Sequence, residues 1–156
     1  MAQEDRALSL SSYSAQPADH GCPVLLLVHT EGDPAQCQAL IAAGVSPDAL
    51  DETVGETALL GASVEGHHSV CELLLKEHSA NTELVDPSSC TPLMRAAEHG
   101  HASIVELLLS HGADPAKKDA NGFNAAAKAQ REGHGRLSVR LAEAEEDAQF
   151  RPRSRN

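Results

Sequence analysis

A period of about 34 residues constrains this chain more than any other feature of its sequence. Gly32, Gly66, Gly100 and Gly133 stand 34, 34 and 33 residues apart, and the last three each begin a Gly-His pair. Each glycine lies between two apolar stretches. A fixed period of this length indicates stacked copies of one small unit, which bury a continuous core between neighbours. We therefore expect a solenoid.

The clearest copy is residues 91–114, TPLMRAAEHGHASIVELLLSHGAD. Thr91 can cap a helix with its hydroxyl, and Pro92 suits the first helical position because its missing N–H is not needed there. Gly100 ends this helix in a turn that favours a left-handed conformation. A second helix with an IVELLL stripe follows, and Gly112 ends it. The copy is thus predicted to be helix, tight turn, helix and loop.

These residues resemble the ankyrin repeat, whose signature is T-P-L-H-x-A, a Gly-His turn and a second helix that ends in LLxxGAD. The resemblance covers about residues 19–142. It implies an all-α ankyrin-repeat solenoid of about four helix-turn-helix repeats, with short β-turn fingers between them. The implied repeats are about 19–50, 51–85, 86–118 and 119–142.

The two ends of the chain lie outside this pattern. We expect residues 1–18 to form a disordered N-terminal tail and residues 143–156 a poorly ordered, charged C-terminal tail, EAEEDAQFRPRSRN.

Some positions depart from the family signature. Leu60, Met94 and Ala127 stand where the family has its His, so packing must hold the junctions between repeats. Two repeats are also one residue longer than the family's 33. We expect the extra residues in the connecting segments Asp48–Glu56 and Ser79–Cys90.

Composition limits the class of protein. Aromatic residues are only 2%, which favours helices packed through small side chains. The chain has 12 Lys and Arg against 23 Asp and Glu, a net charge of −11, and such a surface repels nucleic acid. The longest apolar stretch, Val24–Val28, is far shorter than the roughly 20 residues of a membrane span. The acidic start of the chain does not read as a secretory signal. We expect a cytoplasmic protein, with the nucleus as an alternative.

Charge is unevenly distributed along the repeats. Thirteen acids and two bases lie between His20 and Ala113, whereas residues 114–142 hold six bases and three acids. We therefore expect an acidic concave face that attracts a basic segment of another protein.

Cysteine and histidine do not indicate a metal site or a disulfide. The sequence has no C-x-x-C motif. Equivalent positions of stacked repeats lie about 10 Å apart in this fold, beyond the reach of a disulfide, so we expect free thiols in a reducing compartment. The histidines of the Gly-His pairs occupy the structural turn position of the family. We expect no metal and no cofactor. The four cysteines are Cys22, Cys37, Cys71 and Cys90.

Catalytic motifs are also missing from the sequence. GASVEG at 61–66 is the nearest approach to G-x-S-x-G, but Glu65 stands where the motif requires its second glycine. The same window is already explained as the first helix of a repeat. No glycine-rich phosphate loop occurs. We expect that the chain is not an enzyme.

The resemblance implies binding through finger tips and the ends of the first helices. Phe123 is the only aromatic residue within the repeats and the best hot-spot candidate. The candidate partner-binding residues are Glu52, Thr53, Glu56, Val64, Glu65, Pro87, Ser88, Cys90, Glu98, His99, Ala120, Asn121, Phe123, Arg131 and Glu132.

Two functions remain open at this point. The first is a monomeric adaptor or scaffold. The second is a stoichiometric enzyme inhibitor, because small four-repeat ankyrin proteins include inhibitors of cyclin-dependent kinases. That subfamily shortens the first helix of its second repeat, whereas Thr57–Glu65 is of full length here. The adaptor is therefore favoured.

Overall fold

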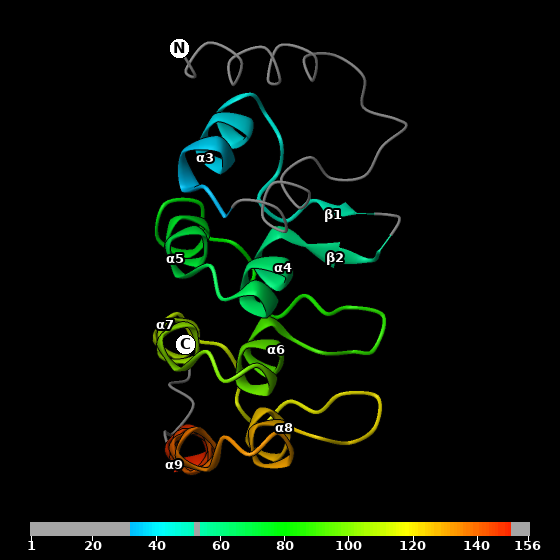
Figure 1. Cartoon of the computed structure of the whole chain (residues 1–156), viewed down its shortest axis with the longest axis vertical. Coiled ribbons are helices and arrows are strands. Elements are labelled where there is room, and N and C mark those ends of the chain that lie inside the picture. Colours follow the sequence, from blue (N-terminus) through cyan, green and yellow to red (C-terminus); the bar gives the residue numbers. More distant parts are fainter. Residues whose placement is uncertain (1–31, 52–53, 151–156) are drawn as a thin grey trace.

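The computed structural model describes residues 32–51 and 54–150. Its helices form two columns, with α4, α6 and α8 in one and α3, α5, α7 and α9 in the other (Figure 1). In chain order the described elements are α3 (Pro34–Ala42), β1 (Leu50–Asp51), β2 (Glu56–Thr57), α4 (Ala58–Glu65), α5 (His68–Lys76), α6 (Pro92–Glu98), α7 (Ala102–Ser110), α8 (Ala125–Arg131) and α9 (Gly135–Phe150). This is the solenoid of helix pairs that the repeat predicted. The segment expected to form the first helix of the first repeat lies outside the described residues.

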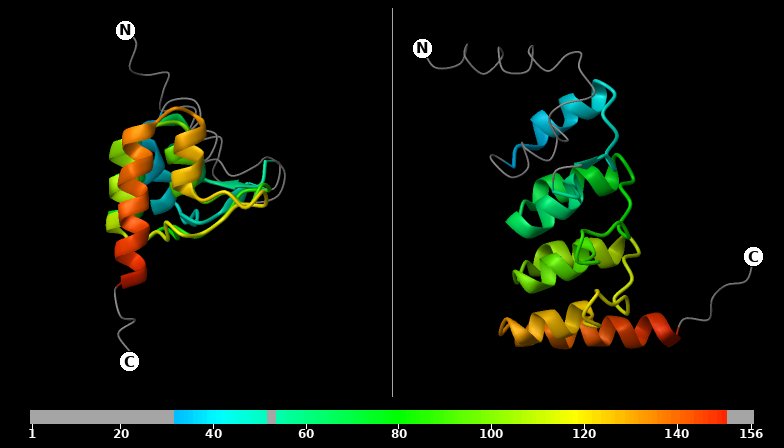
Figure 2. Two further views of the ribbon diagram at one scale, coloured as in Figure 1. Left: turned by 90° about the horizontal axis from the view of Figure 1, so that it is seen from below. Right: turned by 90° about the vertical axis from the view of Figure 1, so that its right-hand side faces the viewer.

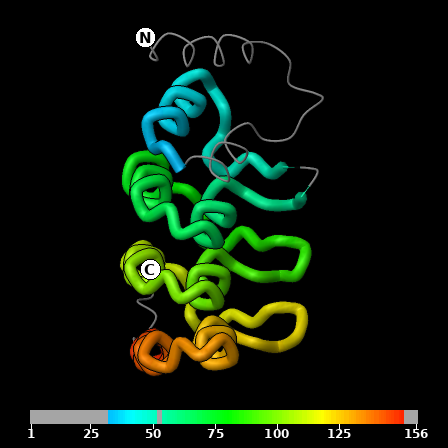
Figure 3. Tube along the Cα trace, in the orientation of Figure 1, coloured from blue at the N-terminus to red at the C-terminus, as the bar shows by residue number. Residues whose placement is uncertain are grey.

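Three connecting segments project to the same side of α4, α6 and α8 (Figure 3). We call them finger 1 (residues 49–57), finger 2 (residues 84–91) and finger 3 (residues 117–124). In finger 1, β1 and β2 pair antiparallel, with Leu50 opposite Thr57. Seen along the stack, the fingers lie at a steep angle to the helices (Figure 2, left). The inner corner between the fingers and α4, α6 and α8 is the concave surface.

Each first helix begins at a side-chain cap. The side chains of Thr57, Thr91 and Asn124 accept hydrogen bonds from backbone N–H groups three residues later. This satisfies one of the donors that a helix start leaves without a partner. Asn124 therefore replaces the capping Thr of the other repeats without loss of the cap.

The core is an apolar layer between the two columns of helices. Leu74 of α5 and Leu108 of α7 occupy equivalent positions, and both are 0% exposed. Leu60 and Met94, each 1% exposed, fill the positions at which the family has its His. Packing therefore holds these junctions, as we expected.

The histidine of each turn packs on the repeat before it. Its ring covers a turn glycine at which an added Cβ would lie closer than 3.0 Å to the ring. Gly66 also has a φ of +80°, so both its space and its backbone require glycine. His101 Nε2 donates a hydrogen bond to the Val64 carbonyl at 2.9 Å. The packed pairs are His67 on Gly32, His101 on Gly66 and His134 on Gly100.

The C-terminal boundary that we expected at residue 142 is wrong. α9 continues as one helix of 16 residues to Phe150, whereas α5 and α7 each have nine. Residues 143–150 therefore belong to the folded array. The expected N-terminal tail, residues 1–18, and residues 151–156 lie outside the described residues. Residues 52–53 of finger 1 also lie outside them.

One of the two extra residues lies within residues 75–79, which meet the expected segment Ser79–Cys90 only at Ser79. The N–H of Ala80 bonds to the carbonyl of Leu74, which is one residue farther apart than the equivalent pair Ala113 and Leu108. The insertion is therefore at the end of α5, where Ser79 adopts a φ of +51°. The other extra residue lies between Asp51 and Thr57, within the expected segment.

Among the described residues, no helix has both the length and the apolar character that crossing a bilayer requires.

Candidate interaction surface

The predicted binding residues form two columns on the concave side. One column is made by the two residues before each turn glycine, which are Val64 and Glu65, Glu98 and His99, and Arg131 and Glu132. The other is made by the fingers and consists of Glu56, Pro87, Ser88, Ala120, Asn121 and Phe123. Glu52 and Thr53 lie outside the described residues. The repeat thus brings residues about 33 positions apart into stacked rows.

Exposure varies along these columns. Glu65, His99, Arg131 and Glu132 are exposed, and Val64 is half-buried. Exposed finger residues are Pro87, Ser88, Ala120 and Asn121, whereas Glu56 and Phe123 are half-buried.

The centre of the concave surface is a set of paired charges, which we call the polar cluster: Asp86, Arg95, Glu98, Asp119 and Lys128. Arg95 binds Asp86 through Nε and Nη2, and its Nη1 lies 2.8 Å from Glu98. Lys128 Nζ lies 3.1 Å from Asp119 and 3.6 Å from Glu98. Glu98 therefore faces one base from its own helix and one from the next repeat.

Burial and pairing set the ionisation of the polar cluster. Burial alone would lower the pKa of Lys128, but the bond to Asp119 raises it above its ordinary value. Burial alone would raise the pKa of Asp119, yet hydrogen bonds from the Phe123 N–H and from Lys128 lower it. The pairing with Asp86 likewise raises the pKa of Arg95 against the effect of burial. Both bases are therefore charged, and they neutralise the acids around them.

Glu98 consequently differs from the acid that we expected. Its side chain is 23% exposed, and Arg95 and Lys128 engage its two oxygens. An acid held in this way contributes little negative potential to a partner. The uniformly acidic concave face is therefore interrupted at its centre.

Cys90 is a second correction, because it is only 1% exposed and cannot contact a partner. Its N–H donates to Asp86 Oδ1 at 3.0 Å, which turns its side chain toward Asp119. Cys37 and Cys71 are buried free thiols, as expected, and Cys90 is also a free thiol. Cys22 lies outside the described residues. Burial raises the pKa of Cys71 to about 12, so this thiol is protonated and unreactive at neutral pH.

The same acids also shape the fingers. Asp86 Oδ1 accepts from the N–H of Ser88 at 2.8 Å, and Asp119 Oδ1 accepts from the N–H groups of Asn121 and Phe123, both at 2.9 Å. Finger 3 bonds to finger 2 through Ala120 N–H and Ser88 O at 3.2 Å. Fingers 2 and 3 are thus fixed relative to one another and, through Asp86–Arg95 and Asp119–Lys128, to α6 and α8.

Two ring contacts fix side chains of the helix-end column. The guanidinium of Arg131 lies 5.0 Å from the centre of the Phe123 ring, within the range of a cation–π contact. The rings of His99 and His101 are stacked with their centres 6.1 Å apart. Phe123 and Arg131 therefore act as one unit at the C-terminal end of the surface.

The sequence reasoning missed an apolar patch on the fingers. Leu50, Val54 and Val85 are 54%, 50% and 37% exposed. Leu50 and Val85 each precede the buried aspartate of their finger, and Lys118 stands at that position in finger 3. This register was a usable signal, because an apolar residue next to a turn-forming aspartate must point away from the finger's inner side.

Within residues 32–51 and 54–150, no group of three or more His, Cys, Asp or Glu side chains is arranged to hold a metal ion. The chemistry that this surface offers is therefore recognition by charge, shape and a few apolar contacts.

A comparison with protein families matches residues 25–119 to a model of ankyrin repeats in three copies. A comparison with curated proteins gave no match.

Proposed function

Because this chain belongs to the ankyrin-repeat family, whose repeats generally bind other proteins, we propose that it is a non-enzymatic adaptor or scaffold. In this proposal the concave surface receives a cationic segment of a partner protein. The segment docks along the helix-end column, from Glu65 toward Phe123 and Arg131.

The observation that carries this proposal is the excess of acids over bases between His20 and Ala113, where both bases are paired with acids. Lys76 pairs with Glu72, and Arg95 belongs to the polar cluster. These are the only two bases between His20 and Ala113. A negative potential therefore persists around α4, and it attracts a cation during encounter.

Finger residues add the contact energy that long-range attraction lacks. Leu50, Val54 and Val85 offer exposed apolar surface, and the Phe123–Arg131 unit offers an aromatic edge. Aromatic and arginine side chains are over-represented among residues that dominate binding energy. We therefore assign the specificity of binding to the finger residues and the long-range attraction of the partner to the acidic residues.

The test begins with crosslinking and affinity purification of the partner from the native source. The association rate of that partner should fall as NaCl rises. Glu65→Lys should weaken binding roughly tenfold, which corresponds to about 1.4 kcal/mol. Glu77→Lys is the matched control, because it reverses an equally exposed acid on the outer helices. Binding that ignores salt and Glu65→Lys but is lost with Glu77→Lys would assign the function to the convex side.

Glu98 is excluded from this test. Reversing it would place a third cation against Arg95 and Lys128, and the fold itself would suffer.

The alternative, a kinase inhibitor, has less support. α4 has eight residues, one more than α6 or α8, so the helix that is shortened in that subfamily is of full length here. We also propose that the protein is a monomer of the cytoplasm, with the nucleus as the alternative. The three buried free thiols support a reducing compartment.

A further inference from the structure

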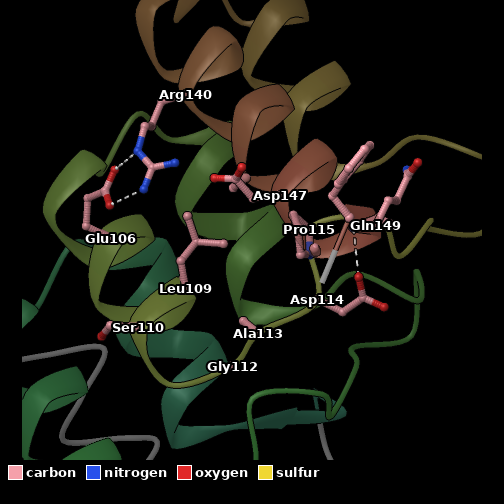
Figure 4. A pocket seen from close by; sticks show the side chains of 14 residues that line it. Glu106, Leu109, Ser110, Gly112, Ala113, Asp114, Pro115, Arg140, Asp147 and Gln149 are labelled. Carbon is pink, nitrogen blue, oxygen red and sulfur yellow. Dashed lines mark hydrogen bonds and ion pairs between the residues drawn. The ribbon is translucent and has the colours of Figure 1, made fainter. Parts of the chain in front are cut away.

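A groove lies on the opposite side of the molecule from the fingers, at the end of α9. α7 ends at Ser110, but α9 runs on to Phe150 and extends past the other helices (Figure 2, right). Its last turns stand over the loop Gly112–Ala116 that leaves α7. The groove between them has a volume of about 1090 Å³. Figure 4 shows the side chains that line it.

The lining of the groove is mixed, and apolar side chains form only part of it. Ala113 and Pro115 of the loop are buried, and Ala144 and Ala148 of α9 face them one turn apart. Phe150 stands at the open end and is 93% exposed. A phenylalanine gains about 1.5–3 kcal/mol when it is fully buried, so this ring is a strong contact for a partner.

An ion pair lies at one end of the groove, and two aspartates lie farther along it. Arg140 Nε and Nη2 bind Glu106 at 2.8 and 3.0 Å, so these two residues neutralise each other. Asp147 from α9 and Asp114 from the loop lie on the two walls farther along (Figure 4). A cation in this part of the groove would therefore meet two carboxylates.

We propose that this groove docks a cationic segment of a partner protein that carries a bulky apolar side chain. The apolar side chain packs on Ala148 and under Phe150, and the adjacent Lys or Arg lies between Asp114 and Asp147. The groove is separate from the concave surface, so this proposal does not depend on the proposed function. It gives the protein two docking sites that different partners can fill.

Other occupants fit the groove less well. The chain's own residues 151–156, RPRSRN, supply cations but no bulky apolar side chain. A second copy of the chain carries a net charge of −11 and is repelled. Nucleic acid is repelled by the same carboxylates.

The test uses random short peptides displayed on phage and selected against the full chain. Peptides with Lys or Arg beside a large apolar residue should be enriched. Their affinity, measured by fluorescence anisotropy, should fall at least tenfold with Ala148→Arg and with Asp147→Lys. Ala142→Arg and Glu143→Lys are matched controls, because both residues are exposed on α9 outside the groove, and they should change affinity less than about twofold. Circular dichroism of each variant checks the fold.

The opposite results overturn the proposal. Selected peptides that are all insensitive to Ala148→Arg and Asp147→Lys would show that the groove binds no such segment. If they are lost only with Glu65→Lys, this inference fails while the proposed function stands. Tenfold tighter peptide binding after Arg151, Arg153 and Arg155 are changed to Gln would make the tail the occupant. A dimer in sedimentation velocity that Ala148→Arg disrupts would make it a second copy.

Discussion

The last junction of the array is bridged by charge, whereas the junction before it is held by apolar packing. Between α6–α7 and α8–α9, Lys128 reaches Glu98 and Arg140 reaches Glu106. Between α4–α5 and α6–α7, no ion pair joins described residues, and His101 Nε2 donates a hydrogen bond to the Val64 carbonyl.

The difference follows from what each first helix can bury. α6 begins with Pro92, Leu93 and Met94, which are all buried, whereas α8 begins with three alanines. Alanine removes far less apolar surface from water than leucine or methionine. Ion pairs supplement the weaker apolar contact of the last repeat. Two neighbouring junctions between repeats of the same backbone fold are therefore held by two different kinds of interaction.

The largest effect should come from the apolar layer, which both junctions share. Leu74→Ala and Leu108→Ala should each cost ~2–5 kcal/mol, since both side chains are fully buried and leave cavities. Urea unfolding measures the loss. Similar losses support the equivalence of the two positions, and an unchanged midpoint for either variant would mean that the repeat register is wrong.

Lys128→Met should cost about 3 kcal/mol at neutral pH, because it leaves Asp119 buried without its cation. The penalty should depend on pH. The lowered pKa of Asp119 means that its ionised form stabilises the folded state above about pH 3.9, and this stabilisation is lost as pH falls through the native pKa. Thermal melts at pH 7 and pH 3 should therefore show a smaller difference between variant and wild type at pH 3. Arg131→Met, on the exposed side of the same helix, is the control, and an equal, pH-independent loss in both would contradict the role of the polar cluster.

Ser79→Gly and Ser89→Gly should each stabilise the protein by about 1 kcal/mol, because φ values of +51° and +61° strain a residue with a Cβ. Both serines lie between α5 and α6, whereas the next connecting segment has Gly112 and Gly122 at φ +84°. Ser103→Gly, within α7, should destabilise the protein instead. Differential scanning calorimetry distinguishes the two directions, and a loss at Ser79 would show that its hydroxyl outweighs the strain.

The smallest effect concerns the exposed bridge. Arg140→Gln should cost about 0.5 kcal/mol at low salt and almost nothing in about 1 M NaCl, where charges are screened beyond about 3 Å. Lys76→Gln removes a bridge within one helix and serves as the control for the junction. Unfolding midpoints over a NaCl series measure both. An effect of Arg140→Gln that salt does not reduce would mean that its packing, and not its charge, holds α9.

Sequence alone predicted the helix pairs, their caps and the turn glycines, because these depend on residues within one repeat. It did not predict that Glu98 is neutralised, since Lys128 lies 30 residues away on another helix. Counting charges along the chain cannot show pairing across a junction. Cys90 looked accessible beside the capping Thr91, but the turn built by Asp86 draws it inward.

The end of α9 escaped prediction for a different reason. The run EAEED is charged and lies outside the repeat pattern, so it favoured a tail. Ala144, which is half-buried against the loop, contributes a contact that only the folded array reveals.

The histidine of each turn packs on the turn glycine of the previous repeat, and this limits how such a chain can change in length. Gly66 is constrained by His101, and Gly32 by His67, so each constraint crosses a repeat boundary. If residues 67–100 were removed, Gly66 would be followed directly by His101, whose ring would then face Gly32 in place of His67. A deletion or duplication of one whole period therefore keeps each turn glycine except the last under a histidine, and a partial one does not. The unit on which gene duplication and loss can act in this protein is accordingly the interval from one Gly-His pair to the next.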